Sequence, residues 1–79
     1  MGKMKVFITI REKKKTAFLV FAENVSQAKT MTNNKDKNGL QNIDVYFVKD
    51  IELNKFAIMP HDYNKATKYM DTSQQIEQL

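Results

Sequence analysis

The sequence has a single histidine, His61, which is the residue best suited to acid–base or metal chemistry. Both kinds of chemistry need several groups placed together, and Asp62 is the one acid beside it in the sequence. The chain has no cysteine, which excludes thiolate metal sites and disulfide bridges. We therefore predict no catalytic residue, no metal ligand and no cofactor, and we interpret His61 as a turn residue near a helix start.

Three carboxylates, Asp44, Asp50 and Glu52, have an even spacing that would place them on one face of a regular strand. Such a face could bind Mg²⁺ or Ca²⁺. However, Asp44 and Asp50 are separated by about 20 Å of extended chain, which is too far for one ion to contact both. A solvated strand edge is the better interpretation. Neither glycine, Gly2 or Gly39, belongs to a phosphate-binding loop pattern, so we do not expect an enzyme.

Basic residues near the start of the chain are the sequence feature that says most about function. Residues 1–15 hold six basic side chains against Glu12 alone, a net charge of +5, whereas residues 16–79 have a net charge of −1. Such an uneven distribution indicates an anionic partner. The other interpretation is that the lysines keep a hairpin tip soluble and prevent it from pairing with another sheet.

Two strands, predicted at residues 4–11 and 16–22, position this charge. The first segment alternates between apolar and polar side chains, and the second is rich in β-branched and aromatic residues. Residues 12–15 form a connection of hairpin length. A register that pairs Arg11 with Thr16 gives one wholly apolar face, which we expect to be core. Its pairs are Val6 with Phe21, Ile8 with Leu19 and Ile10 with Ala17.

The opposite face of this hairpin combines positive charge with two aromatic rings. Proteins that bind single-stranded nucleic acid use both on their sheets, because basic groups neutralise phosphates and rings stack on bases. We therefore predict a nucleic-acid contact in which Phe7 or Phe18 stacks on bases. The alternative is that these rings lie beneath a helix. The predicted nucleic-acid-binding residues are Lys5, Phe7, Arg11, Lys13, Lys14, Lys15 and Phe18.

A short helix is predicted after the hairpin. Asn24 is a candidate N-cap, with Gln27 as its capping-box partner. Val25, Ala28 and Met31 fall on one helical face. The polar segment 33–39 is expected to end the helix in a loop, with its glycine suited to positive φ.

Two further strands are predicted at residues 40–51 and 56–59. In the first, Ile43, Val45 and Phe47, with Ile51, are expected on one face. Pro60 is expected to stop the second strand.

A last helix is predicted after Asp62, its candidate cap, and it either runs to Leu79 or breaks near residues 71–73. Its apolar stripe contains residue types that are common at interfaces. The stripe either docks on the protein's own sheet or binds a partner, including a second copy in a homodimer. The predicted partner-binding residues are Tyr63, Tyr69, Met70 and Ile76.

The fold class that follows is α+β: a small single domain over residues 1–79, with an antiparallel sheet and two helices in the order ββαββα. We expect residues 1–3 to be disordered or an upstream remnant, and residues 71–79 to be a frayed tail. The absence of cysteine indicates a reducing compartment, most simply the cytoplasm. No apolar run is long enough to cross a membrane, so no membrane association is expected.

The predicted function is that of a small basic, non-enzymatic binding protein that contacts nucleic acid or nucleoprotein through the basic hairpin. The alternative is a protein-binding accessory factor, such as a phage- or plasmid-encoded inhibitor or adaptor of a host protein. A composition with many lysines and a single arginine is typical of AT-rich coding, which suits a low-GC bacterium or its mobile elements.

Overall fold

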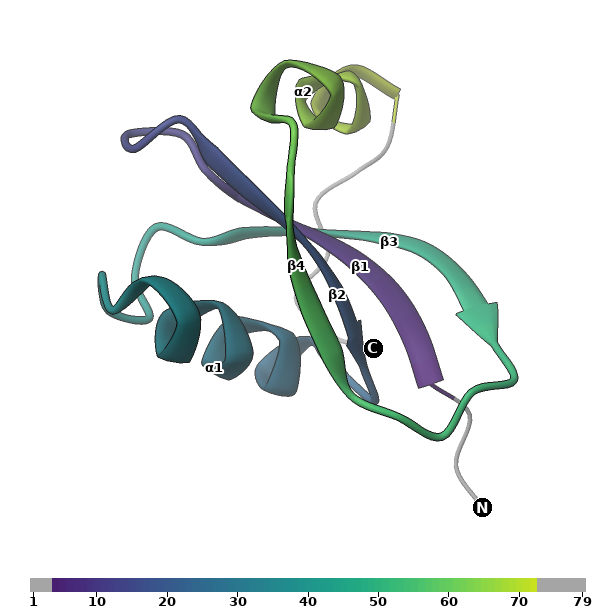
Figure 1. Cartoon of the computed structure of the whole chain (residues 1–79). Helices are drawn as coiled ribbons and strands as arrows, with labels where there is room; N and C mark the ends of the chain where they lie inside the picture. The colour runs from purple at the N-terminus through teal and green to yellow at the C-terminus, as the bar shows by residue number, and fades with distance from the viewer. Residues whose placement is uncertain (1–3, 73–79) are drawn as a thin grey trace.

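A computed structural model describes residues 4–72, which form four strands and two helices (Figure 1). The α+β class and the order ββαββα are confirmed. Residues 1–3 and 73–79, and with them the predicted contact residue Ile76, lie outside the described part. The elements are β1 (Met4–Arg11), β2 (Thr16–Ala22), α1 (Val25–Asp36), β3 (Asp44–Ile51), β4 (Ala57–His61) and α2 (Tyr63–Thr72).

The sheet has the strand order β3-β1-β2-β4, and every neighbouring pair is antiparallel. The first hairpin therefore occupies the centre, and β3 and β4 are the two edges. The predicted register of β1 and β2 is confirmed, with Arg11 opposite Thr16. The connecting turn closes with a hydrogen bond from the Lys15 N–H to the Glu12 carbonyl at 3.2 Å. Lys15 takes the positive φ of this turn, 52°.

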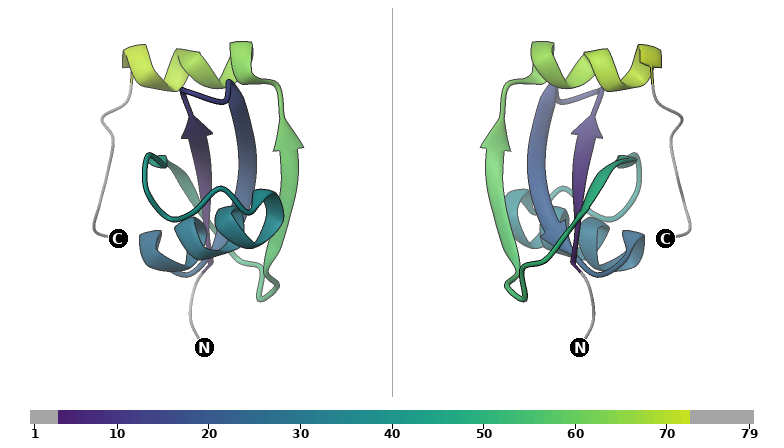
Figure 2. Two further views of the ribbon diagram at one scale, coloured as in Figure 1. Left: turned by 90° about the vertical axis from the view of Figure 1, so that its left-hand side faces the viewer. Right: turned by 90° about the vertical axis from the view of Figure 1, so that its right-hand side faces the viewer.

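The two helices cover opposite faces of the sheet. Because side chains alternate along a strand, Phe7 and Phe18 point to one face and Ile8 and Ile10 to the other. The first face packs against α1 and the second against α2. Figure 2 shows α1 crossing one face, while α2 lies across the strand ends beside the β1–β2 turn. Both faces of the hairpin therefore contribute to the core, and on the wholly apolar face Leu19 and Phe21 are only half-buried.

The first helix begins as predicted and ends later than predicted. Asn24 is its N-cap, with its Oδ1 accepting the Gln27 N–H at 2.8 Å. The Gln27 side chain accepts from the N–H of Glu23, one residue before the cap, at 2.9 Å. The helix continues to Asp36, so residues 33–36 of the segment expected to be a loop are helical. Lys37 follows it in the left-handed conformation, with φ of 58°.

A β-bulge in β3 changes which side chains share a face. Val6 lies opposite Lys49 and Phe7 lies opposite Phe47, which leaves Val48 as the extra residue. Asp44 therefore lies opposite Ile10 and Asp50 opposite Lys5, on different faces of the sheet. The even spacing of these acids does not bring them together, and Ile51 does not share a face with Val45 and Phe47. Within residues 4–72 no three His, Cys, Asp or Glu side chains cluster in a way that could hold a metal ion.

The last strand continues through Pro60 to His61, where the sequence predicted a stop. Pro60 lies opposite Phe18 on the edge strand. An edge strand tolerates proline because its missing N–H can face solvent instead of a neighbouring strand. Neither α1 nor α2, the helices of the described part, is long and apolar enough to span a membrane.

Candidate nucleic-acid interface

The two aromatic rings predicted to stack on bases are buried in the protein's own core. Phe7 is fully buried and Phe18 is 8% exposed. Both belong to a cluster that includes Val25 and Ala28 of α1. The stacking prediction is therefore wrong, because α1 covers the face that would have to be open. The alternative, that these rings lie beneath a helix, is the one the structure shows.

Arg11 is also withdrawn from solvent, because its hydrogen-bond donors are used inside the protein. Its Nε donates to Asp36 Oδ2 at 2.5 Å, and its Nη2 donates to Oδ1 at 3.2 Å. Its Nη1 donates to the carbonyl oxygen of Gln41 at 3.0 Å, and its Nη2 also donates to that of Gly39. With 4% of its surface exposed, Arg11 fixes the fold and does not reach a phosphate.

Lys5 lies at the end of β1 away from the turn, opposite Ala22 and Asp50. Its ammonium donates to the carbonyl oxygen of Glu23 at 3.4 Å. The structure therefore separates Lys5 from the lysines of the turn, and it does not belong to the same surface.

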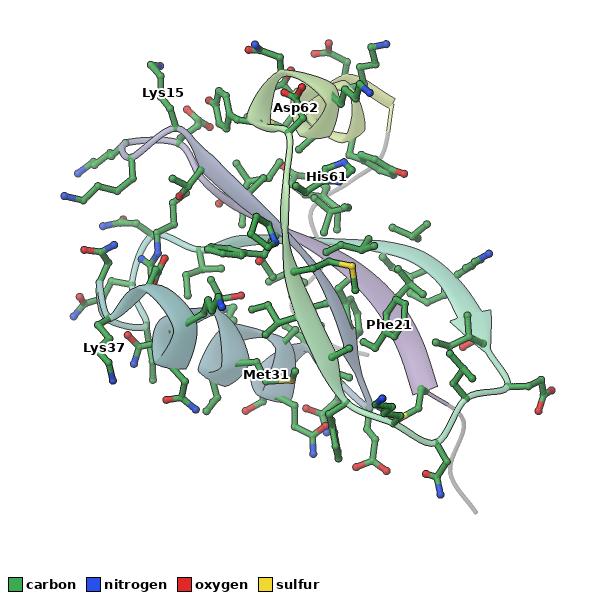
Figure 3. All side chains as sticks on the ribbon, in the orientation of Figure 1. Lys15, Phe21, Met31, Lys37, His61 and Asp62 are labelled. Carbon is green, nitrogen blue, oxygen red and sulfur yellow. The ribbon has the colours of Figure 1, made fainter. Side chains whose placement is uncertain are left out.

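The three turn lysines, Lys13, Lys14 and Lys15, are exposed. Figure 3 shows Lys15 projecting from the tip of the hairpin. Its Nζ lies 5.7 Å from the centre of the Tyr63 ring, a cation–π contact with the first residue of α2. The turn is thereby held against α2, so the charges of both elements belong to one end of the molecule.

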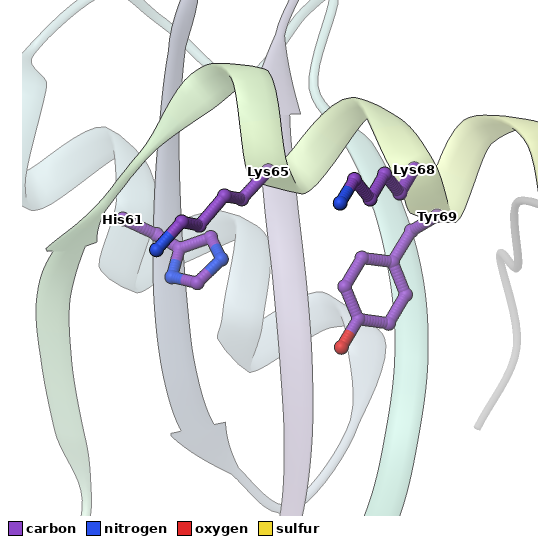
Figure 4. A pocket seen from close by; sticks show the side chains of 4 residues that line it. All are labelled: His61, Lys65, Lys68 and Tyr69. Atoms are coloured by element: carbon purple, nitrogen blue, oxygen red, sulfur yellow. The ribbon is translucent and has the colours of Figure 1, made fainter.

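Helix α2 adds basic residues that the sequence analysis did not assign. Lys65 and Lys68 are exposed and three positions apart, a spacing that places them on one side of a helix. Together with His61 and Tyr69 they line a pocket of about 340 Å³ (Figure 4). The spacing of the two lysines was a signal in the sequence, but the position of α2 at the hairpin-turn end of the sheet was not. We call the basic residues at this end of the molecule the basic end and define it by Lys13, Lys14, Lys15, His61, Lys65 and Lys68.

Acidic groups lie on the opposite flank of the turn, towards β3. Glu12, Lys13 and Asp44 line a shared hollow there. Burial, and then the negative charge of Glu12, raises the pKa of Asp44, while Lys29 acts in the opposite direction. Burial, followed by the charges of Asp44 and Glu12, raises the pKa of Tyr46. The flank of the turn towards β3 therefore carries two acidic groups beside Lys13.

The residues of α2 predicted to bind a partner pack on the protein's own sheet. Ala66 is fully buried, and Tyr63, Tyr69 and Met70 are half-buried against the same cluster. Docking on the sheet explains their apolar stripe without a partner.

A second surface, which the sequence analysis did not single out, is an apolar furrow between α1 and β4. It consists of two neighbouring hollows of about 290 and 230 Å³ that share Met31. Phe56 lines the first hollow and is 52% exposed, and Ile58 lines the second.

Comparison with known proteins finds no similarity: no family model matches the chain, and no curated protein or solved structure matches it.

Proposed function

We propose that this protein binds nucleic acid through phosphate contacts at the basic end. The observation that supports this is the contact of Lys15 with Tyr63, which brings the exposed turn lysines and the lysines of α2 to one end of the fold. Lysine ammonium groups neutralise backbone phosphates and release condensed counterions, which supplies affinity without reading the bases.

The burial of Phe7 and Phe18 changes the binding mode from the one expected from sequence. Because these two buried rings cannot stack on bases, binding through the turn lysines depends on charge. Contacts from the five lysines of the basic end imply a slope of about −4 for log affinity against log salt. Affinity should therefore fall steeply with salt and vary little with base sequence.

Fluorescence anisotropy tests the proposal, with labelled single-stranded DNA, duplex DNA and RNA at about 50 and 200 mM salt. Reversal of the three turn charges, K13E/K14E/K15E, is expected to weaken binding by more than about tenfold, because three phosphate contacts become repulsive. The matched control is K35E/K49E/K55E, which changes the net charge equally at exposed lysines on α1, β3 and the β3–β4 connection. Retained affinity in the turn variant, with circular dichroism showing an intact fold, would contradict the proposal.

The second candidate function is that of a protein-binding accessory factor, and the apolar furrow is the observation that favours it. Phe56, which lines the furrow, is 52% exposed, and aromatic side chains are enriched at the centres of protein interfaces. A partner captured from a nuclease-treated lysate and lost with Phe56→Asp would favour this function. A partner lost on nuclease treatment would favour nucleic-acid binding instead.

A further inference from the structure

The pocket on the basic end lies where β4 meets α2. His61 is the last residue of β4, and Lys65, Lys68 and Tyr69 follow on the first two turns of α2. Figure 4 shows the side chains of Lys65 and His61 reaching into the same hollow, with the phenol of Tyr69 on its other side. The site therefore draws on two elements that the β4–α2 junction holds together.

The chemistry of this lining is that of an anion site. The two ammonium groups, the imidazole and the phenol can all donate hydrogen bonds, and the ammonium groups are charged. None of the four described residues that line it is acidic. Asp62, which follows His61 in the sequence, is engaged as the cap of α2, with its Oδ1 accepting the Asn64 N–H at 2.8 Å.

We propose that this pocket binds a phosphate monoester, either of a free mononucleotide or at the end of a nucleic-acid strand. A monoester carries close to two negative charges near neutral pH and three terminal oxygens, so two lysines and an imidazole can each engage it. The rings of His61 and Tyr69 supply flat surface for the attached nucleoside. A volume of about 340 Å³ lies in the range of small-molecule pockets.

The charge of the site favours a terminal phosphate over an internal one. A phosphodiester within a strand has one negative charge and two chain substituents, so it offers fewer charged oxygens to the two lysines and the imidazole. The exposed turn lysines, at the same end of the molecule, can contact such internal phosphates. The form of this proposal that involves a strand end rests on the nucleic-acid binding proposed above; the mononucleotide form does not.

The first arm of the test uses one single-stranded oligonucleotide, labelled at its 3′ end and prepared with either a 5′-phosphate or a 5′-hydroxyl. We expect the phosphorylated strand to bind about tenfold more tightly, the effect of one or two charge-assisted hydrogen bonds. K65Q/K68Q should weaken both strands, because both lysines belong to the basic end, and should bring the ratio of their affinities to about one. K13Q/K14Q/K15Q is the matched control, and it should weaken both strands and leave their ratio unchanged.

The second arm uses the mononucleotide AMP, with adenosine as its control, and follows the imidazole resonances by NMR. The chain has one histidine, so these resonances report on His61 without ambiguity. AMP is expected to shift them, and adenosine at the same concentration is not. K65Q/K68Q should abolish the shift.

Each outcome decides between the two sources of the phosphate. A preference for the phosphorylated strand together with an AMP shift supports recognition of a strand end. If AMP shifts the resonances and both strands bind equally, the pocket is assigned to free mononucleotides. If AMP shifts the resonances and no strand binds, the pocket is again assigned to mononucleotides, but the proposed nucleic-acid function fails. Equal strand binding with no AMP shift, or an equal shift with adenosine, overturns the phosphate pocket.

Discussion

The guanidinium of Arg11 and the carboxylate of Asp36 form an ion pair that fastens the end of β1 to the end of α1. Its Nε lies 2.5 Å from Asp36 Oδ2, and the two side chains are only 4% and 12% exposed. The same guanidinium donates to carbonyl oxygens of the α1–β3 connection, among them that of Gln41 at 3.0 Å. One cation thus joins the last residue of α1 to the loop that follows it.

Removal of this cation is expected to destabilise the protein strongly. Arg11→Met should lower the free energy of unfolding by about 3 kcal/mol, because Asp36 keeps a poorly hydrated charge without its partner. The double variant R11M/D36M should recover part of the loss, since no unpaired charge remains. Urea denaturation monitored by circular dichroism measures both. A loss below about 1 kcal/mol in Arg11→Met would place the pair among weak surface ion pairs.

The hydrogen bond between two buried threonines predicts that substitution of one costs more stability than substitution of the other. The hydroxyl of Thr32 donates to the Ala28 carbonyl at 2.9 Å, so the Thr9 hydroxyl, 2.7 Å away, must donate to Thr32. Thr32→Val leaves the Thr9 donor buried without an acceptor and should cost about 2 kcal/mol. Thr9→Val removes that donor and should cost less.

The double variant T9V/T32V should be more stable than Thr32→Val alone, because the orphaned donor is gone. A double-mutant cycle from chemical denaturation measures this coupling. Strictly additive losses would show that the two hydroxyls do not depend on one another.

The left-handed residue after α1 offers a stabilising substitution. Lys37 has φ of 58°, and a side chain there costs about 1 kcal/mol relative to glycine. Lys37→Gly should therefore raise the free energy of unfolding by about that amount. The matched control is Lys35→Gly, which removes the same charge two residues earlier but inside the helix, where glycine should destabilise by about 1 kcal/mol. Equal effects of the two changes would indicate that charge, and not backbone conformation, decides stability here.

Because the pKa of Asp44 is raised, we expect the stability of the protein to depend on pH. A carboxyl group whose pKa is higher in the folded than in the unfolded protein stabilises the fold when it is protonated. This stabilisation is present below the ordinary pKa and is lost as the pH rises through the raised pKa. Asp44→Asn should therefore be more stable than the wild type at neutral pH, with a difference that shrinks in acid. Because the charge of Asp44 also raises the pKa of Tyr46, the variant should lower that pKa in an NMR titration of the ring. An unchanged Tyr46 titration would contradict this coupling.

The central hairpin could be predicted from sequence in detail because its determinants are local. Alternation of apolar residues and a connection of hairpin length place Arg11 opposite Thr16, and the structure has that register. The caps of both helices, Asn24 and Asp62, are equally local, since each accepts an N–H two or three residues further on.

What sequence reasoning missed depends on contacts between distant segments. The helix α1 extends through residues with weak helical propensity because Asp36 meets Arg11, which lies 25 positions earlier. Once that helix covers the sheet, Phe7 and Phe18 become core, and no local pattern distinguishes a covered ring from a stacking ring. The bulge at Val48 likewise arises from pairing with β1, and it reverses the side on which Asp50 lies.

The strand order β3-β1-β2-β4 also implies an order of assembly. The β1–β2 pair closes a short loop and so loses the least chain entropy, whereas β3 and β4 must dock across much longer stretches of chain. The hairpin is also complete before either flanking strand has left the ribosome, since synthesis proceeds from the N-terminus. We expect the two edges to add to a preformed centre, so the segment with the highest positive charge would be the first to become structured.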